Sequence, residues 1–128
     1  MKKLFEKMQI NTKNLLNSDF VDPKKFPKTR GVYLIYDDND IIYVGKAKQL
    51  NRRINSDHIS GENKITTSTF RRKLCKKFNQ KPGQWIRKWI CNNCKFKYIE
   101  VEDPDLCDAT ESFLILYLRA GGKKLLNS

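Results

Sequence analysis

The stretch GVYLIYDDNDIIYVG, residues 31–45, decides the fold of this chain. Two runs rich in β-branched and aromatic residues surround a polar turn, a pattern typical of a β-hairpin with strands at about 31–37 and 40–45. Side chains alternate along a strand, so Tyr33 and Tyr43 share a face only if the loop after Asp37 has an odd number of residues. A three-residue loop pairs Asp37 with Ile41 and makes the tyrosines diagonal neighbours, whereas a two-residue loop separates them. We expect the odd loop, because a shared active site needs both phenols on one face.

A basic helix is expected directly after the hairpin. Lys46 ends the second strand, and a helix at about 47–57 carries Arg52 and Arg53. This helix has little apolar surface, so it must pack through Leu50 and Ile54, an i,i+4 pair. Tyrosine, lysine and arginine gathered this closely can hold a phosphate and handle a proton beside it.

Further helices are expected on both sides of this region. Residues 1–20 suggest a short helix followed by a loose segment, and the prolines of 22–27 suggest an extended lead-in to the hairpin. A loop is expected at 58–65, around Gly61. The next helix should begin near Thr67-Ser68, which are plausible N-cap residues. Its buried stripe is expected to comprise Phe70, Leu74 and Phe78.

The last third of the chain predicts two more helices and one strand. Trp85, Ile86, Trp89 and Ile90 indicate a short amphipathic helix with core tryptophans, and alternation indicates a strand at about 95–101. Asp103-Pro104 is a strong helix start and Gly121-Gly122 a stop, which gives a helix at about 104–119. Its inward residues are expected to be Leu106, Phe113, Leu114 and Tyr117. The fold class is therefore α+β, with a small sheet of about three strands flanked by helices.

Charge is distributed unevenly along the chain, whose 128 residues suit a single domain with one core. The net charge is +12, and residues 46–97 hold fifteen basic and two acidic groups, whereas residues 98–111 hold six acidic groups and no basic one. A basic field suits a polyanion, so DNA or another nucleic acid is the expected partner. No apolar run is long enough for a membrane span and no secretory leader is evident, so we expect a cytoplasmic protein without a membrane partner.

The four cysteines leave alternatives open. Cys91 and Cys94 have the two-residue spacing of a zinc knuckle or a redox pair, but Cys75 and Cys107 are distant in sequence. Four reduced, mostly buried thiols are the favoured interpretation. A zinc-dependent interaction protein that uses Cys91 and Cys94 remains a third hypothesis for function.

The pattern Gly-Val-Tyr, then Tyr-Val-Gly ten residues on, with Arg53 ten residues after Tyr43, resembles the GIY-YIG nuclease family. The run from Tyr43 to Leu50 is similar to the nuclease domain of the bacterial excision-repair incision subunit. A carboxylate on a late helix, Glu111, and a closing asparagine, Asn127, add to the resemblance. It covers roughly residues 31–127, so we divide the chain into an extension, 1–30, and a GIY-YIG-like domain, 31–128. The resemblance implies a three-stranded antiparallel sheet.

The resemblance also implies a metal-dependent endonuclease that hydrolyses phosphodiester bonds in DNA. Glu111 would bind Mg²⁺ or Mn²⁺, and Arg53 would pair with the scissile phosphate. Tyr33 and Tyr43 would bind the attacking water, and one of them, acidified by Lys46, would act as base. Which tyrosine is the base is open.

The helix that carries Arg53 departs from the family's pattern at one position. Many family members carry a His or Tyr four residues after the arginine, but here Asp57 holds that position and His58, the only histidine, follows it. His58 is a catalytic candidate if the helix ends there and the ring swings in. Asn127 matches the family's terminal asparagine.

Target selection is less defined by the sequence. Basic residues expected to contact nucleic acid are Lys48, Arg52, Arg71, Arg72, Lys73, Lys76 and Lys77. Specificity would come from these helices, from residues 1–30 or from a separate targeting protein or domain. The alternative function is a nucleic-acid-binding module that keeps the fold without cleaving.

Overall fold

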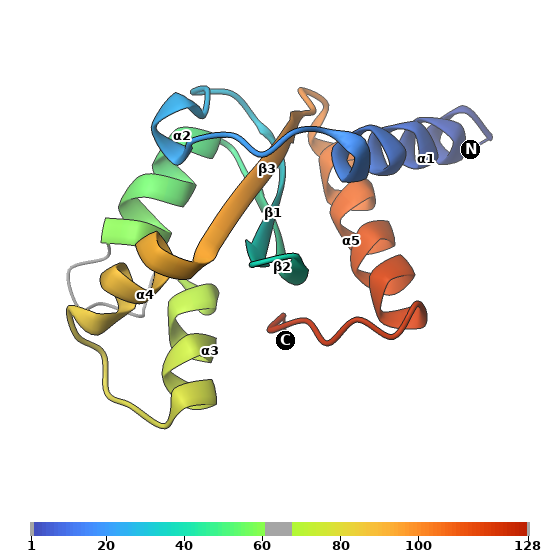
Figure 1. Cartoon of the computed structure of the whole chain (residues 1–128). Helices are drawn as coiled ribbons and strands as arrows, with labels where there is room; N and C mark the ends of the chain where they lie inside the picture. The colour runs from blue at the N-terminus through green and yellow to red at the C-terminus, as the bar shows by residue number, and fades with distance from the viewer. Residues whose placement is uncertain (1, 61–67, 128) are drawn as a thin grey trace.

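A three-stranded antiparallel sheet lies between two groups of helices in the computed structural model, which describes residues 2–60 and 68–127 (Figure 1). The strand order is β2-β1-β3, so the first strand of the hairpin is central and the second is an edge. The expected α+β class is confirmed. The elements in chain order are α1 (Lys2–Asn17), the 3-10 turn η1 (Pro23–Lys25), β1 (Gly31–Asp37), β2 (Asp40–Ala47), α2 (Leu50–Arg52), the π-helix η2 (Arg53–Ser60), α3 (Thr69–Phe78), α4 (Trp85–Asn93), β3 (Cys94–Glu100) and α5 (Pro104–Ala120).

The hairpin differs from the expected register. Asp37 pairs with Asp40 across a two-residue loop, so the predicted odd-numbered loop is wrong. A β-bulge supplies the shift instead: Ile35 pairs with Tyr43 and Tyr36 with Ile41, which leaves Ile42 as the extra residue. A bulge adds one residue to one strand and so exchanges the faces of all residues beyond it.

One face of the sheet carries Tyr33, Ile35 and Tyr43, covered by η2, α3 and α4. Leu50 and Ile54 are fully buried in this layer, as the i,i+4 spacing predicts. Ser68 caps α3 by accepting a hydrogen bond from the Arg71 backbone N–H at 3.1 Å. This helix–sheet layer holds most of the aromatic residues near the expected site.

The opposite face carries Val32, Leu34 and Val44, covered by α5 and α1. The buried stripe of α5 contains Cys107, Thr110, Leu114 and Leu118. In Figure 1, α1 and α5 lie on one side of the strands and α2, α3 and α4 on the other. Helix α1 joins this layer through the buried Leu15, and Lys97 donates from Nζ to the carbonyl of Leu16 at 2.9 Å, whereas Phe26 packs on the face of the tyrosines.

Several local expectations are wrong. Phe78 is 37% exposed and Tyr117 is 56% exposed, so neither belongs to its predicted stripe. The lead-in contains a 3-10 turn capped by Asp22, not an uninterrupted extended segment. Residues 58–60 are helical, and the rest of the loop expected around Gly61, with the Thr67 cap, lies outside the described residues.

Within 2–60 and 68–127, none of the helices has the length and apolar character needed to cross a bilayer.

Candidate active site

The two tyrosines of the hairpin meet on one face of the sheet. Their ring centroids are 6.4 Å apart, with Tyr33 fully buried and Tyr43 6% exposed. Tyr33 lies opposite Gly45 on the edge strand, and a methyl group built on Gly45 would overlap Cζ and Oη of the phenol. The glycine therefore lets the Tyr33 hydroxyl reach across β2 toward the edge of the sheet.

His58 joins the two tyrosines because the helix that carries it, η2, is wound irregularly. A π-helix is wound with i→i+5 hydrogen bonds, so residues five apart align. In η2 this aligns His58 with Arg53, and Asp57 instead forms an ion pair with Arg53 at 3.3 Å. Nε2 of His58 lies 2.6 Å from the Tyr33 hydroxyl, and Nδ1 lies 2.6 Å from Oγ of Ser68. The extra residue between Arg53 and His58 is accommodated by the winding, not by an early helix end.

Burial keeps His58 neutral. The ring is fully buried, and desolvation, with the charges of Arg53 and Arg71, lowers its pKa from 6.5 to about 3. Burial also raises the pKa of Tyr33 far above its ordinary value, and the nearby phenol of Tyr43 adds to that rise. The site thus holds a neutral phenol against a neutral imidazole.

Arg53 is the cation that most lowers the pKa of both phenols. It hydrogen-bonds to Tyr33 and its charge lowers the pKa of Tyr33 and of Tyr43, although burial outweighs it at both. Lys46 was the expected acidifying group, but its Nζ lies 2.8 Å from a carboxylate oxygen of Asp108 on α5, which raises the lysine pKa. Lys46 therefore points to the α5 side of β2.

Glu111 reaches the site from the other layer. The role that the resemblance implies for Glu111 predicts that α5 crosses the face that carries the tyrosines, and this prediction is wrong, because the apolar stripe of α5 packs on the opposite face. Burial raises the pKa of the Glu111 carboxyl, while the charges of Lys46 and Arg53 lower it. Its own charge raises the pKa of Tyr33 and of Tyr43. Glu111 thus acts electrostatically on both phenols past the edge strand.

The chain end fixes that edge strand. The side chain of Asn127 accepts from the Val44 N–H at 3.0 Å and donates to the Val44 carbonyl at 2.6 Å. Leu126 donates its N–H to the Ile42 carbonyl at 2.7 Å, beside the bulge. The segment covers backbone groups that an edge strand otherwise leaves open. Asn127 therefore binds the backbone of β2 through both of its amide atoms.

A basic cleft of about 610 Å³ adjoins these residues. Lys48 and Arg52, both expected to contact nucleic acid, line it together with Arg53 and with Arg30, which sequence reasoning missed. Asp108 also lines the cleft, although sequence reasoning counted it only within the acidic run of residues 98–111. Its position three residues before Glu111 on a helix could have shown that the two carboxylates are neighbours.

The other expected nucleic-acid residues lie on α3. Arg72, Lys76 and Lys77 are exposed and Lys73 is half-buried. Arg71 is only 1% exposed, and its Nη1 donates to the carbonyls of His58 and Ile59 at 2.7 and 3.1 Å. Arg71 therefore holds the end of η2 in place.

The cysteines are all unbridged, with Cys75 and Cys107 buried and Cys91 exposed. Burial raises the pKa of Cys94 to about 12. In the part of the chain that the structure describes, no three His, Cys, Asp or Glu side chains gather in a way that could hold a metal ion.

A sequence model of the GIY-YIG catalytic domain matches residues 8–127, which includes most of the first thirty residues. The fold is similar to the GIY-YIG N-terminal endonuclease domain of UvrC from Thermotoga maritima. One solved structure is a tyrosine-to-phenylalanine point mutant of that domain, bound to its catalytic divalent cation. Its sequence is 17% identical to this chain, the TM-score is 0.51, and the match covers 100% of this chain and 99% of that chain. The same domain bound to magnesium is 17% identical, with a TM-score of 0.48 and the same coverage. A search among curated proteins found no match.

Proposed function

The chain belongs to the GIY-YIG catalytic domain family, and we propose that it is a metal-dependent endonuclease that hydrolyses phosphodiester bonds in DNA. The observation that carries the proposal is the buried Tyr33 hydroxyl, held by Nε2 of His58 at 2.6 Å and by Arg53. This hydroxyl lies over Gly45, within the field of a half-buried carboxylate, Glu111, and its partner Arg53 lines the basic cleft.

Hydrogen-bond chemistry favours Tyr33 as the group that receives a proton. A guanidinium only donates, so Tyr33 Oη accepts from Arg53 and its own hydrogen is available to Nε2 of His58. The Nδ1–H of His58 then donates to Oγ of Ser68, which also accepts from the Arg71 N–H. Tyr33 Oη can take a proton from water as its own proton moves to Nε2.

This relay explains how a strongly buried phenol could serve as a base. A free phenolate is disfavoured here, because burial raises the pKa of Tyr33. In a relay the phenol gives up one proton as it gains another, so no phenolate forms. The proton rests on His58, whose pKa rises when a negatively charged phosphate enters the adjoining cleft. Tyr43 would orient the same water from the neighbouring position.

Glu111 fits a site for Mg²⁺ or Mn²⁺. Magnesium usually keeps several waters and takes one or two carboxylates with substrate phosphate oxygens, so a single carboxylate is a sufficient donor set when a substrate phosphate supplies the other oxygens. When bound, the ion would stabilise charge on the phosphate and the leaving oxygen. Arg53 would hold the same phosphate through its guanidinium. Lys46, paired with Asp108, would keep α5 against β2 and so position Glu111.

A plasmid-nicking assay tests the proposal. Supercoiled DNA should be nicked with Mg²⁺ or Mn²⁺ and left intact with chelator. The Glu111→Gln variant should lose nicking and keep DNA binding, because an amide is a poor ligand for a hard cation. The matched control is Glu102→Gln, an exposed position, which should nick normally. Binding without nicking by the unaltered protein would instead establish the non-cleaving module.

We propose the cytoplasm as the setting of the reaction. Four unbridged thiols suit a reducing cytoplasm. DNA is the proposed partner, and a separate targeting protein or domain would add specificity if the basic surface proves indiscriminate.

A further inference from the structure

A second basic hollow lies away from the active-site cleft. It has a volume of about 870 Å³ and is bounded by the end of η2, by α3 and by α4 with the two residues that precede it. None of the described residues that line it also lines the cleft. Its size falls within the range of about 300–1,000 Å³ that is usual for small-ligand sites.

The charge of this hollow calls for an anion. Its described lining includes Arg71, Arg87 and Lys88 and no acidic side chain. The first turn of α4 has no acidic residue either, although acidic groups stabilise that end of a helix and cations do not. Arg87 and Lys88 are exposed beside the rigidly held Arg71, so mutual repulsion would fall when a phosphate enters. Helix stability therefore does not explain these cations.

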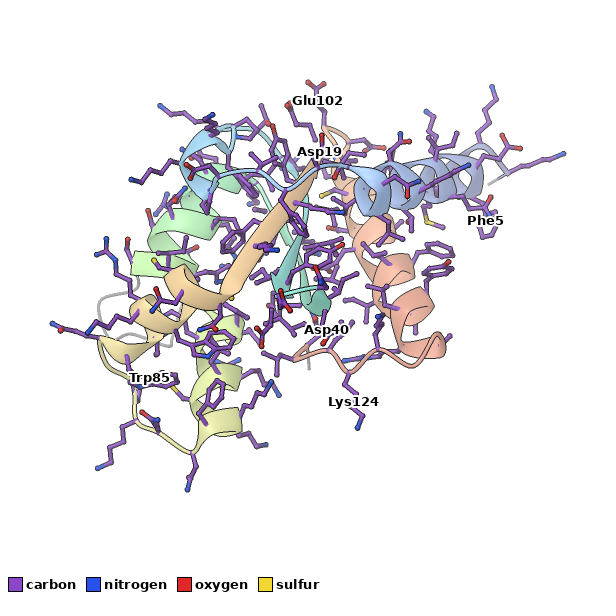
Figure 2. The ribbon with its side chains drawn as sticks, viewed as in Figure 1. Phe5, Asp19, Asp40, Trp85, Glu102 and Lys124 are labelled. Carbon is purple, nitrogen blue, oxygen red and sulfur yellow. The ribbon has the colours of Figure 1, made fainter. Side chains whose placement is uncertain are left out.

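An aromatic ring stands in the same wall. Trp85 lines the hollow, and its indole N–H is already satisfied by the Lys81 carbonyl at 2.7 Å. Phe78 supports the ring edge-on, with centroids 5.9 Å apart. Trp85 begins α4 at the end of the molecule opposite Phe5 on α1, and its side chain is partly buried against the core (Figure 2). With its polar group satisfied, the ring offers an apolar surface on which a base can stack.

We propose that this hollow binds one unstacked nucleotide of a single DNA strand. Arg87 and Lys88 would hold its phosphate and Trp85 its base. A base inside a duplex is already stacked on its neighbours, so the ring selects a strand whose bases are free. The inference rests on the proposed function in one respect, because that strand would belong to the DNA that the active site cuts. The substrate class would then be duplex DNA with a single-stranded segment.

Tryptophan fluorescence gives a direct test in the presence of chelator, where metal-dependent cleavage does not occur. The chain has two tryptophans, so a Trp89→Phe background makes Trp85 the only reporter. We expect a short oligothymidylate to quench its emission, and a blunt duplex of the same length or inorganic phosphate to leave it unchanged. Quenching by phosphate alone would mean a general anion site, and equal quenching by the duplex would rule out an unstacked base. Either result overturns the proposal.

Charge variants supply the second measurement. In the Arg87→Gln/Lys88→Gln variant, the slope of log affinity for oligothymidylate against log salt should become shallower by about 0.7, since the two side chains hold one phosphate and each neutralised phosphate of a single strand contributes about 0.7. The matched control, Lys7→Gln/Lys13→Gln, removes the same charge from exposed positions on α1 and should keep the steeper slope. Equal slopes in the two variants would refute the site. Quenching without plasmid nicking would refute the endonuclease and leave this site standing, and nicking without quenching would do the reverse.

Discussion

Acidification is the perturbation that tests the buried network around Tyr33 most directly. His58 is the only histidine and is fully buried between Tyr33 and Ser68. Its pKa is lowered from 6.5 to about 3, chiefly by burial. The folded protein therefore resists binding a proton that the unfolded chain accepts readily.

The sign and size of the effect follow from this difference. Above pH 6.5 the ring is neutral in both the folded and the unfolded state, so His58 adds no pH dependence to the free energy of unfolding. Below pH 6.5 the unfolded state binds a proton that the folded state does not, so the free energy of unfolding falls as pH falls, until pH nears the folded value of about 3. At about 1.4 kcal/mol per pH unit, His58 should cost about 2 kcal/mol of stability between pH 6.5 and pH 5.

Urea denaturation at pH 7.5, 6.5 and 5 measures this dependence. The comparison is with His58→Gln, which cannot be protonated, because carboxylates contribute to the pH dependence of both proteins alike. The difference between the two curves should grow by about 2 kcal/mol between pH 6.5 and 5, with the variant less sensitive to acid.

Proton NMR offers an independent reading if the glutamine variant does not fold. A single histidine gives one Cε1–H resonance, which should not titrate between pH 5 and 8 in the folded protein. A midpoint near 6.5 would refute the desolvation of the imidazole and the loss of stability expected from it in acid. Parallel stability curves for the two proteins would have the same consequence.

Three other predictions concern the edge strand and the basic surface. Gly45→Ala should displace Tyr33, lower the free energy of unfolding by about 1–3 kcal/mol in urea denaturation, and abolish plasmid nicking. Full nicking activity would show that the phenol need not lie over this residue. Asn127→Ala should speed amide exchange at Val44 and cost about 1–2 kcal/mol, whereas Lys124→Ala should do neither; unchanged exchange would deny the clamp. If the basic surface makes about six contacts to duplex phosphates, log affinity should fall with log salt at a slope near −5, and a flat slope would mean a merely solvated surface.

Sequence patterns were sufficient where regular periodicity governs packing. The hairpin strands, the Leu50–Ile54 pair and the start of α5 at Pro104 follow from alternation, helical spacing and capping, and each is present. The inner stripe of α5 was misplaced because Thr110 and Cys107 lie inward beside Leu114, and counting large apolar residues favoured Tyr117 instead. The choice between neighbouring faces of a helix depends on the surface it meets, which the local sequence does not contain.

The position of Glu111 illustrates the same limit at the scale of layers. Chemistry required the carboxylate near Arg53 and the phenols, and the simplest arrangement put α5 on their face of the sheet. The helix lies on the opposite face, and its carboxylate acts past β2, where Gly45 has no side chain to intervene. The function implied that the Glu111 carboxylate lies near Arg53 and the phenols. The face from which Glu111 approaches depends on the strand order, in which β2 is at the edge of the sheet.

The site itself departs from regular structure twice, and both departures add one residue. In β2 the bulge at Ile42 moves Tyr43 to the face of Tyr33 despite a two-residue loop. In η2 the π winding aligns His58 with Arg53 although five residues separate them. A perfectly alternating strand would put Tyr43 on the other face, and an α-helix would put Asp57 where His58 lies. The positions of Tyr43 and His58 beside Tyr33 thus each depend on an inserted residue, which is why periodicity that located the elements failed within the site they build.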